Sequence, residues 1–292
     1  MILVTGATGN LGTATIDFLL KKGIEAGSIL ALVRDKQAAS DFENKGIGVV
    51  EGDYNNYASL VTAFKGVEQL FFISGNDLEK RLTQHHNIVA AAKEAGVKHV
   101  VYTSFQRINE TETSPLWLVA QSHIKTEQWL KESNLEYTIL KNNLYMDFLP
   151  AFIGGKVLDA GVIYAPAESG KVSAVLRSEM AEAAATILST TGHGGKEYDF
   201  TNAVAVSYQE IAQWISEVSG REIQYHSPTA KAYGATLRSY GVPEEVIGIF
   251  SNFAVAQAEG ELAAVNTDLE LLLGRKPLSI EAFIKNLYAP KE

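Results

Sequence analysis

With 292 residues, 46% of them hydrophobic and 20% charged, the chain is long enough and apolar enough to bury a full globular core. Its net charge of −9 argues against a nucleic-acid partner, and the lack of cysteine excludes disulfides, thiolate metal ligands and cysteine nucleophiles. No apolar run approaches the ~20 residues that span a bilayer, and no basic, apolar leader opens the chain. We therefore expect a cytoplasmic protein without membrane contact.

The first predicted element is a short apolar run over residues 1–5, which is typical of a strand buried on both faces. Gly6, Gly9 and Gly12 follow at equal spacing, and an apolar helical pattern comes directly after them. A strand, a glycine turn and a helix start form an anion site, because free backbone N–H groups converge above the turn. We predict a dinucleotide here: Gly6 allows the tight turn, Gly9 the approach of the pyrophosphate, and Gly12 close packing of the helix.

Strands and helices then alternate along the first half of the chain. This alternation predicts an α/β protein with a Rossmann-like, doubly wound parallel sheet and helices on both faces. The further strands are expected over 28–33, 47–51, 69–73, 99–103 and 137–140, and the main helices over 59–64, 81–95 and 116–133.

The pattern changes beyond about residue 150, where short extended pieces are separated by several helices. Two of these helices are expected to begin with capping boxes, Ser207 to Glu210 and Thr267 to Glu270. No linker separates the two halves. We expect an NAD(P)-binding domain over residues 1–150 and an interlocked, smaller substrate-binding lobe over residues 151–292. The lobe would close a cleft over the carboxyl ends of the strands, where such sheets bind ligands.

Polar residues at the ends of the predicted strands are candidate cofactor contacts. Arg34 ends the second strand, where an acidic residue would bind a ribose hydroxyl and an arginine accommodates a 2′-phosphate. Arg34 therefore favours NADP(H) over NAD(H), although the charge of Asp35 opposes a phosphate unless it turns away. Asp53 ends the third strand, within reach of the adenine amino group, and Ser74 and Gly75 end the fourth, beside the middle of the cofactor.

His85 and His86 are adjacent in the predicted helix over 81–95. Adjacent helical residues do not share a face, so they do not form a metal pair, and we expect them at the surface or between the lobes. The other His, Asp and Glu residues show no ligand spacing. We predict no metal.

The glycine motif, Thr5-Gly-Ala-Thr-Gly-Asn-Leu-Gly12, resembles that of the short-chain dehydrogenase/reductase superfamily in its extended and atypical branches. Reductases of that superfamily carry Tyr-x-x-x-Lys on the helix after the fifth strand, where the tyrosine donates a proton and the lysine holds the ribose. Alignment on Glu127 places Val119 at the tyrosine position and His123 at the lysine position. The resemblance therefore implies a reductase that lacks the proton-donating dyad.

The chain as a whole resembles the NmrA-like branch, in particular the subgroup of type 2 NAD(P)H:quinone oxidoreductases and triphenylmethane reductases. Shared marks are Leu32-Val-Arg34, Gly52-Asp-Tyr54, Phe72-Ile-Ser-Gly75, Tyr102-Thr-Ser104, His123-Ile-Lys-Thr-Glu127 and Tyr137-Thr-Ile-Leu-Lys-Asn142. The resemblance implies cofactor contacts along the glycine turn and the strand ends. They are expected from Gly6, Thr8, Gly9, Asn10, Leu11, Gly12, Arg34, Asp53, Ser74, Gly75, Thr103, Lys141 and Asn142.

The missing tyrosine fits acceptors that need no dedicated proton donor. Hydride addition to a quinone or a dye cation gives a delocalised or neutral product, so orientation against a flat acceptor can supply most of the rate. Ser104 and His123 are candidates to hydrogen-bond the acceptor or the nicotinamide ribose. Tyr145, Phe148 and Phe152 can form an aromatic wall, and core packing explains them equally well. The sequence leaves open which of residues 103–105 faces the site.

These observations predict an NAD(P)H-dependent oxidoreductase that transfers hydride to quinone-like or other electron-poor aromatic acceptors. His123, Ser104 and Tyr145 are its candidate catalytic residues. The alternative is a dinucleotide-binding redox sensor without turnover, which the missing dyad suits equally well. A sugar-nucleotide epimerase shares the glycine motif but requires the tyrosine. The acceptor and the oligomeric state, monomer or homodimer, stay open.

Overall fold

The computed structural model describes residues 1–290, and its centre is a seven-stranded sheet in the order β3-β2-β1-β4-β5-β6-β9. Every neighbouring pair of strands is parallel. The chain order reverses beside β1, which is the switch point of a doubly wound sheet, and the expected Rossmann-like α/β fold is confirmed. The strands are β1 (Ile2–Val4), β2 (Ile29–Val33), β3 (Gly48–Glu51), β4 (Gln69–Phe72), β5 (His99–Phe105), β6 (Glu136–Asn142) and β9 (Lys196–Phe200).

Alternate residues of the central strands pack on opposite faces of the sheet. Ile2 and Val4 of β1 belong to one buried cluster, and Leu3 between them belongs to another. Phe71 and Phe72 of β4 divide between the same two clusters. Because both faces are covered, these strands are continuous apolar runs in the sequence.

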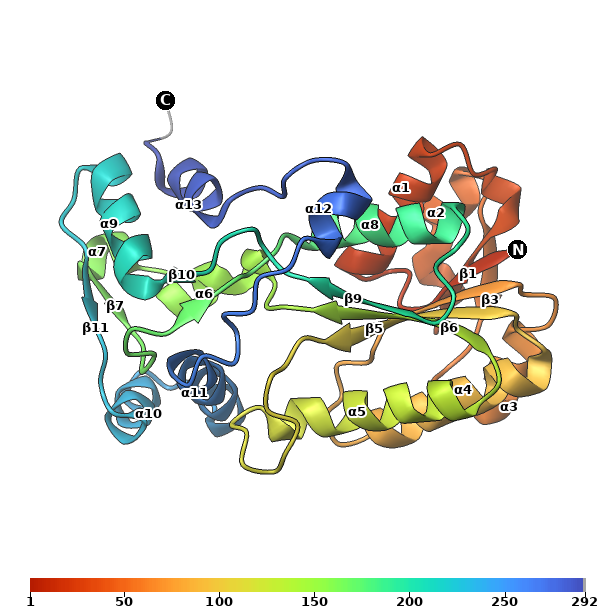
Figure 1. Ribbon diagram of the computed structural model, residues 1–292, viewed down its shortest axis with the longest axis horizontal. Helices are drawn as coiled ribbons and strands as arrows, with labels where there is room; N and C mark the ends of the chain where they lie inside the picture. The colour runs from red at the N-terminus through yellow and green to blue at the C-terminus, as the bar shows by residue number, and fades with distance from the viewer. Residues whose placement is uncertain (291–292) are drawn as a thin grey trace.

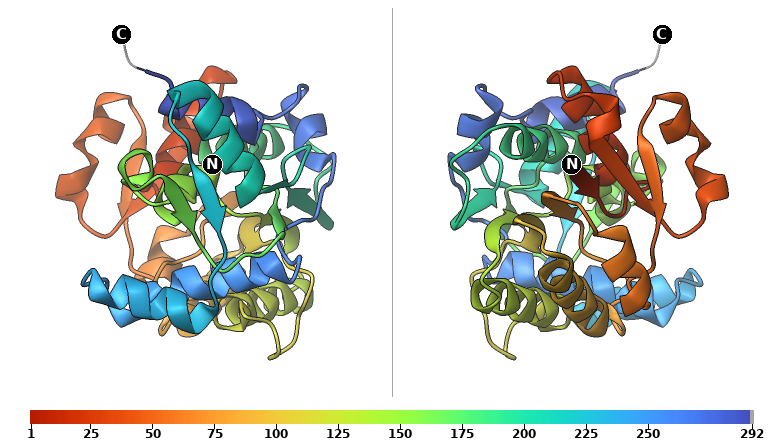
Figure 2. Two further views of the ribbon diagram at one scale, coloured as in Figure 1. Left: turned by 90° about the vertical axis from the view of Figure 1, so that its left-hand side faces the viewer. Right: turned by 90° about the vertical axis from the view of Figure 1, so that its right-hand side faces the viewer.

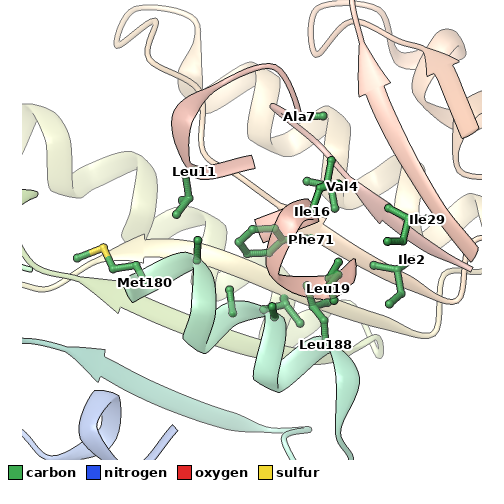
Figure 3. Close-up of a cluster of buried hydrophobic side chains, with 14 of the residues drawn as sticks. Ile2, Val4, Ala7, Leu11, Ile16, Leu19, Ile29, Phe71, Met180 and Leu188 are labelled. Atoms are coloured by element: carbon green, nitrogen blue, oxygen red, sulfur yellow. The ribbon is translucent and has the colours of Figure 1, made fainter. Parts of the chain in front are cut away.

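One face of the sheet is covered by α1, α8 and α12, which come from both halves of the chain (Figure 1). Helix α8 lies along α1, and Figure 3 shows Leu19 of α1 close to Leu188 of α8. Helix α8 and strand β9 follow residue 150, so the main sheet and its covering helices contain residues from both sides of the expected domain boundary. That boundary stays a prediction. The helices are α1 (Asn10–Lys21), α8 (Arg177–Ser189) and α12 (Asp268–Leu273).

The opposite face is covered by α3, α4 and α5, which lie together below the sheet in Figure 1. Helix α4 ends at Gly96, whose φ of +74° is the left-handed conformation that glycine adopts readily. No helix among residues 1–290 is both long and apolar enough to cross a membrane. The bounds on this side and at the sheet edge are α2 (Ser40–Asn44), α3 (Tyr57–Ala63), α4 (Arg81–Ala95), α5 (Trp117–Glu132), η1 (Ala26–Ser28) and η2 (Lys36–Ala39).

A second lobe lies beyond the carboxyl ends of the strands and has its own buried cluster (Figures 1 and 2). This lobe contains two short sheets, in which β8 is antiparallel to β10 and β7 is parallel to β11. Its elements are η3 (Met146–Phe148), α6 (Leu149–Ile153), α7 (Val157–Ala160), β7 (Val162–Tyr164), β8 (Lys171–Val172), β10 (Val206–Ser207), α9 (Tyr208–Ser219), β11 (Gln224–His226), α10 (Ala230–Ser239), α11 (Glu244–Ala258) and α13 (Ile280–Tyr288).

One of the two expected capping boxes forms. The Ser207 hydroxyl accepts the backbone N–H of Glu210, and the Glu210 carboxylate accepts the N–H of Ser207 at 2.8 Å. The prediction for Thr267 is wrong, because its backbone (φ −99°, ψ −1°) is not the extended one of a side-chain cap. The side chain of Asn266 accepts the N–H of Asp268 instead.

Candidate active site

A cleft of about 600 Å³ opens at the carboxyl ends of β1, β2, β3 and β4. Its walls are the turns after these strands, the start of α4, and the side chains of Tyr145 and Arg177. This is the place where open parallel sheets bind ligands. Of the residues expected to contact the cofactor, all but Thr103, Lys141 and Asn142 line this cleft: Gly6, Thr8, Gly9, Asn10, Leu11, Gly12, Arg34, Asp53, Ser74 and Gly75.

The glycine turn leaves an open anion site at the centre of the cleft. Gly6 has a φ of +57°, and a Cβ on Gly12 would lie 2.4 Å from the Gly6 carbonyl oxygen. Helix α1 begins after Gly9 with no side-chain cap and no acidic residue in its first turn. The amides of Leu11 and Gly12 donate no hydrogen bond within residues 1–290. The turn therefore fits the pyrophosphate of a dinucleotide.

At the end of β2, Arg34 lines the cleft with an exposed side chain. The carboxylate of Asp35 is engaged elsewhere, because it accepts the N–H of Gln37 at 2.8 Å and caps η2. Beyond β3, the Asp53 carboxylate accepts both the backbone N–H and the side-chain amide of Asn55, at 2.9 and 3.0 Å. At the end of β2, the Arg34 guanidinium therefore faces the cleft, whereas the carboxylate of the neighbouring Asp35 caps η2.

The end of β5 supports the cleft but does not line it. Thr103 is 2% exposed, and its hydroxyl accepts the backbone N–H of Ser74 at 3.0 Å. Ser104 points to the opposite face and donates to the carboxylate of Glu127. Arg107 binds the same carboxylate with two nitrogens, each at 2.8 Å. The Ser104 hydroxyl is thus held by a buried ion pair, and its expected contact with a ligand stays a prediction.

Lys141 and Asn142 at the end of β6 also lie away from the lining of the cleft. The Lys141 ammonium pairs with Glu197 of β9 at 2.7 Å. Asn142 is 3% exposed, and its Oδ1 atom has no hydrogen-bond partner among the described residues. Their expected contact with a cofactor therefore has no support from these positions.

His123 lies behind the wall of the cleft, 4% exposed. The Tyr102 hydroxyl is 2.6 Å from its Nδ1 atom, and Nη1 of Arg81 is 3.5 Å from its Nε2 atom. Burial lowers the pKa of His123 well below the usual range, and the charge of Arg81 adds to this shift. Burial raises the pKa of Tyr102. A neutral imidazole and a protonated phenol therefore stand behind the cleft.

His85 is fully buried, so the expectation that both histidines lie at the surface or between the lobes is wrong for this one. Its Nε2 atom accepts the N–H of Gly75 at 3.3 Å, and its Nδ1 atom is 2.9 Å from the hydroxyl of Thr126. Burial and the charge of Arg81 lower the pKa of His85 to about 3. His86 is exposed and packs its edge on an indole of α5.

The far end of the cleft is aromatic and cationic. The rings of Tyr145 and Phe148 stack with centroids 6.0 Å apart, and Phe148 is 46% exposed. The Arg177 guanidinium lies 5.6 Å from the first ring and 4.9 Å from the second, and it pairs with Asp147 at 3.4 Å. Phe152 is buried in the core of the second lobe. Of the three aromatic residues expected to form a wall, Tyr145 lines the cleft and Phe148 stacks on it, and their contact with an acceptor stays a prediction.

Arg81, Gln84 and Arg177 were not predicted as site residues, although Gln84 and Arg177 line the cleft. A signal for Arg81 exists, since a cation in the first turn of a helix faces the positive end of the helix dipole. Within residues 1–290, no three His, Asp or Glu side chains gather as a metal site.

The sequence matches the NmrA-like family over residues 1–284. The chain belongs to this family. Quinone oxidoreductase 2 of Escherichia coli (strain K12) is 34% identical over 288 residues, which cover 99% of each chain. A solved structure of the NADPH-dependent quinone oxidoreductase QOR2 of E. coli with NADPH superposes with a TM-score of 0.92, at 34% identity and covering 99% of this chain and 100% of that one. The triphenylmethane reductase of Citrobacter sp. with NADP(H) gives a TM-score of 0.91 at 37% identity, covering 98% of this chain and 99% of that one.

Proposed function

We propose that the chain is an oxidoreductase that binds NADP(H) in the cleft and reduces quinones or other electron-poor aromatic acceptors. One observation carries this proposal: a single cleft joins an open glycine turn to the ring of Tyr145, which stacks on Phe148. The similar proteins are named as a quinone oxidoreductase and a triphenylmethane reductase, and both were solved with NADPH or NADP(H).

The cofactor half of the proposal rests on the turn and on the end of β2. The open N-terminus of α1 would hold the pyrophosphate. Arg34 would hold a 2′-phosphate, and the carboxylate of Asp35 is directed to the start of η2, where it accepts the N–H of Gln37. A guanidinium at the end of β2 favours NADP(H) over NAD(H).

The acceptor half rests on position rather than on proton donation. When bound, the cofactor supplies a hydride from its nicotinamide ring. Tyr145 lines the cleft and stacks on Phe148, so its ring would offer a flat face to an aromatic acceptor, and Arg177 lies over both rings. Tyr102 and His123 are buried behind the cleft, where burial keeps the phenol protonated and the imidazole neutral, so neither is an exposed acid in place of the missing dyad.

The test follows NADPH oxidation by its near-ultraviolet absorbance, with purified protein and a panel of quinones and triphenylmethane dyes. A titration with NADPH and NADH is run beside it. Saturable turnover, with tighter binding of NADPH than of NADH, would support the proposal. Tight binding with no turnover on any acceptor would overturn it and favour a redox sensor.

A further inference from the structure

Arg81 is a buried cation without an acidic partner. It is the first residue of α4 and is 7% exposed. Its Nε atom donates to the Gly75 carbonyl at 2.7 Å, and Nη1 is 3.5 Å from Nε2 of His123. Within residues 1–290, Nη2 makes no hydrogen bond and no carboxylate lies within 4.0 Å of the guanidinium. The carboxylate of Asp77, one turn earlier, pairs with Lys80 at 3.7 Å instead.

Such an arrangement is unfavourable for the folded protein. A buried charge is costly unless it is paired, and a cation at the N-terminus of a helix faces the positive end of the helix dipole. Arg107 shows how this chain neutralises a buried arginine: its side chain is 2% exposed and it contacts both Glu110 and Glu127. Arg81 breaks two rules, since it is a buried charge without an acidic partner and a cation at a helix N-terminus. Such an exception beside a cleft points to a functional role.

Arg81 lies directly behind the lining of the cleft. Gly75, whose carbonyl oxygen accepts a hydrogen bond from its Nε atom, lines the cleft, as do Lys80, which precedes α4, and Gln84 within α4. Burial raises the pKa of Tyr145, and the charge of Arg81 is among those that oppose this shift. The field of the guanidinium therefore reaches the phenol of the aromatic wall.

We propose that Arg81 stabilises the negative charge that develops on an acceptor oxygen at the Tyr145 end of the cleft, in place of the missing proton donor. The inference rests on the proposed function. A quinone that takes up a hydride, with its two electrons, becomes the monoanion of a hydroquinone, while the dihydronicotinamide is oxidised. Water then supplies the proton that completes the reduction. A fixed cation beside the new oxyanion lowers the barrier without giving up a proton.

This role separates two classes of acceptor. A neutral quinone gains negative charge as the hydride arrives, so Arg81 favours its reduction. A cationic triphenylmethane dye loses its positive charge in the same step, so Arg81 offers it nothing and opposes its binding. The chain is therefore expected to select neutral carbonyl acceptors over cationic dyes.

The test compares Arg81→Gln, Arg81→Lys and Lys93→Gln, the last removing an exposed charge at the other end of α4. Arg81→Gln is expected to lower kcat/KM for a quinone about tenfold to a hundredfold, the size of a lost charge-assisted interaction. The same variant should keep kcat/KM for the dye at or above the wild-type value. Arg81→Lys should retain most of the quinone activity, and Lys93→Gln all of it. Equal losses with both acceptors, or no loss with quinone, would overturn the role of Arg81.

A second measurement does not depend on turnover. A nitrophenol, whose ionised form absorbs visible light, is bound to the NADP⁺-loaded protein and titrated with acid. The wild type and Arg81→Lys should hold the pKa of the bound phenol below its value in Arg81→Gln. The same pKa in all three would contradict the proposal. If the wild type reduces neither acceptor, the proposed function fails, and this titration still decides the role of Arg81.

Discussion

The two ends of the cleft are built in different ways. The glycine-turn end consists of consecutive backbone between β1 and α1, supplemented by side chains at the ends of β2 and β3. The aromatic end consists of side chains from distant elements, and Arg81 and His123, which meet behind the cleft, are 42 residues apart in the chain. The first end is a property of a short sequence, whereas the second exists only once the fold has formed.

This difference has a physical basis. A backbone anion site needs only glycine at fixed spacing and an uncapped helix start. A buried polar network needs each donor and acceptor to be satisfied by a partner that the tertiary fold supplies. The two ends should therefore respond differently to substitution.

The largest effect is expected from Gly9→Asp. A carboxylate at the start of α1 would repel the pyrophosphate, so the Kd for NADPH should rise about a hundredfold, the loss of a strong charge-assisted contact. A fluorescence titration measures this. Gly27→Asp is the matched control, because Gly27 is exposed and a Cβ there would meet no atom within 4 Å. Equal binding by both variants would contradict a cofactor site at the turn.

The buried network should appear in the pH dependence of stability. The pKa of His85 is about 3 in the folded protein and about 6.5 in the unfolded chain, so between these values the unfolded chain binds the extra proton. The free energy of unfolding should therefore fall below pH 6.5, by about 1.4 kcal/mol per pH unit for this site. Burial of His123 acts in the same direction.

Urea unfolding at several pH values measures this dependence. His85→Gln should give a flatter profile between about pH 4 and 6.5 than the wild type, since it removes one of the titrating groups. His86→Gln, at the exposed neighbouring position, should give a profile parallel to the wild type. Parallel profiles for all three proteins would show that His85 ionises alike in the folded and unfolded chains.

Arg34→Gln should separate the two forms of the cofactor. Loss of the guanidinium is expected to raise the Kd for NADPH about tenfold and to change that for NADH by less than about twofold. Lys36→Gln, two residues further on and outside the lining of the cleft, is the control for net charge. An equal change in both Kd values would show that Arg34 does not cause a preference for NADP(H).

The smallest effect is expected from Tyr145→Leu. Loss of one aromatic face should raise the KM for a quinone about threefold to tenfold and leave the Kd for NADPH unchanged. Tyr240→Leu is the control, because Tyr240 is 78% exposed in the second lobe, outside the cleft lining. Weaker binding of NADPH with an unchanged KM for the quinone would show that the acceptor does not bind at Tyr145.

The predicted strands and the first helices agree closely with the structure, because periodicity and glycine signals are local. The helix expected over residues 81–95 is α4, and the strand expected over 28–33 is β2 (Ile29–Val33). Membership of β9 in the main sheet was not predictable, since nothing in residues 196–200 names β6 as their partner.

Predictions about single side chains were less reliable. His85 is buried against the sheet and α5, because α4 packs a polar face inward. The capping box at Thr267 has the correct residues but lacks the backbone conformation that the motif requires. Side-chain direction depends on packing, which a local pattern does not contain.

The most direct test of the central claim, that one cleft brings cofactor and acceptor together, is a crystal structure with NADP⁺ and a quinone. We expect the pyrophosphate over residues 9–12, the 2′-phosphate at Arg34 and the quinone against Tyr145, on the side of Arg81. A dinucleotide outside the glycine turn, or a quinone away from the Tyr145 end, would contradict it.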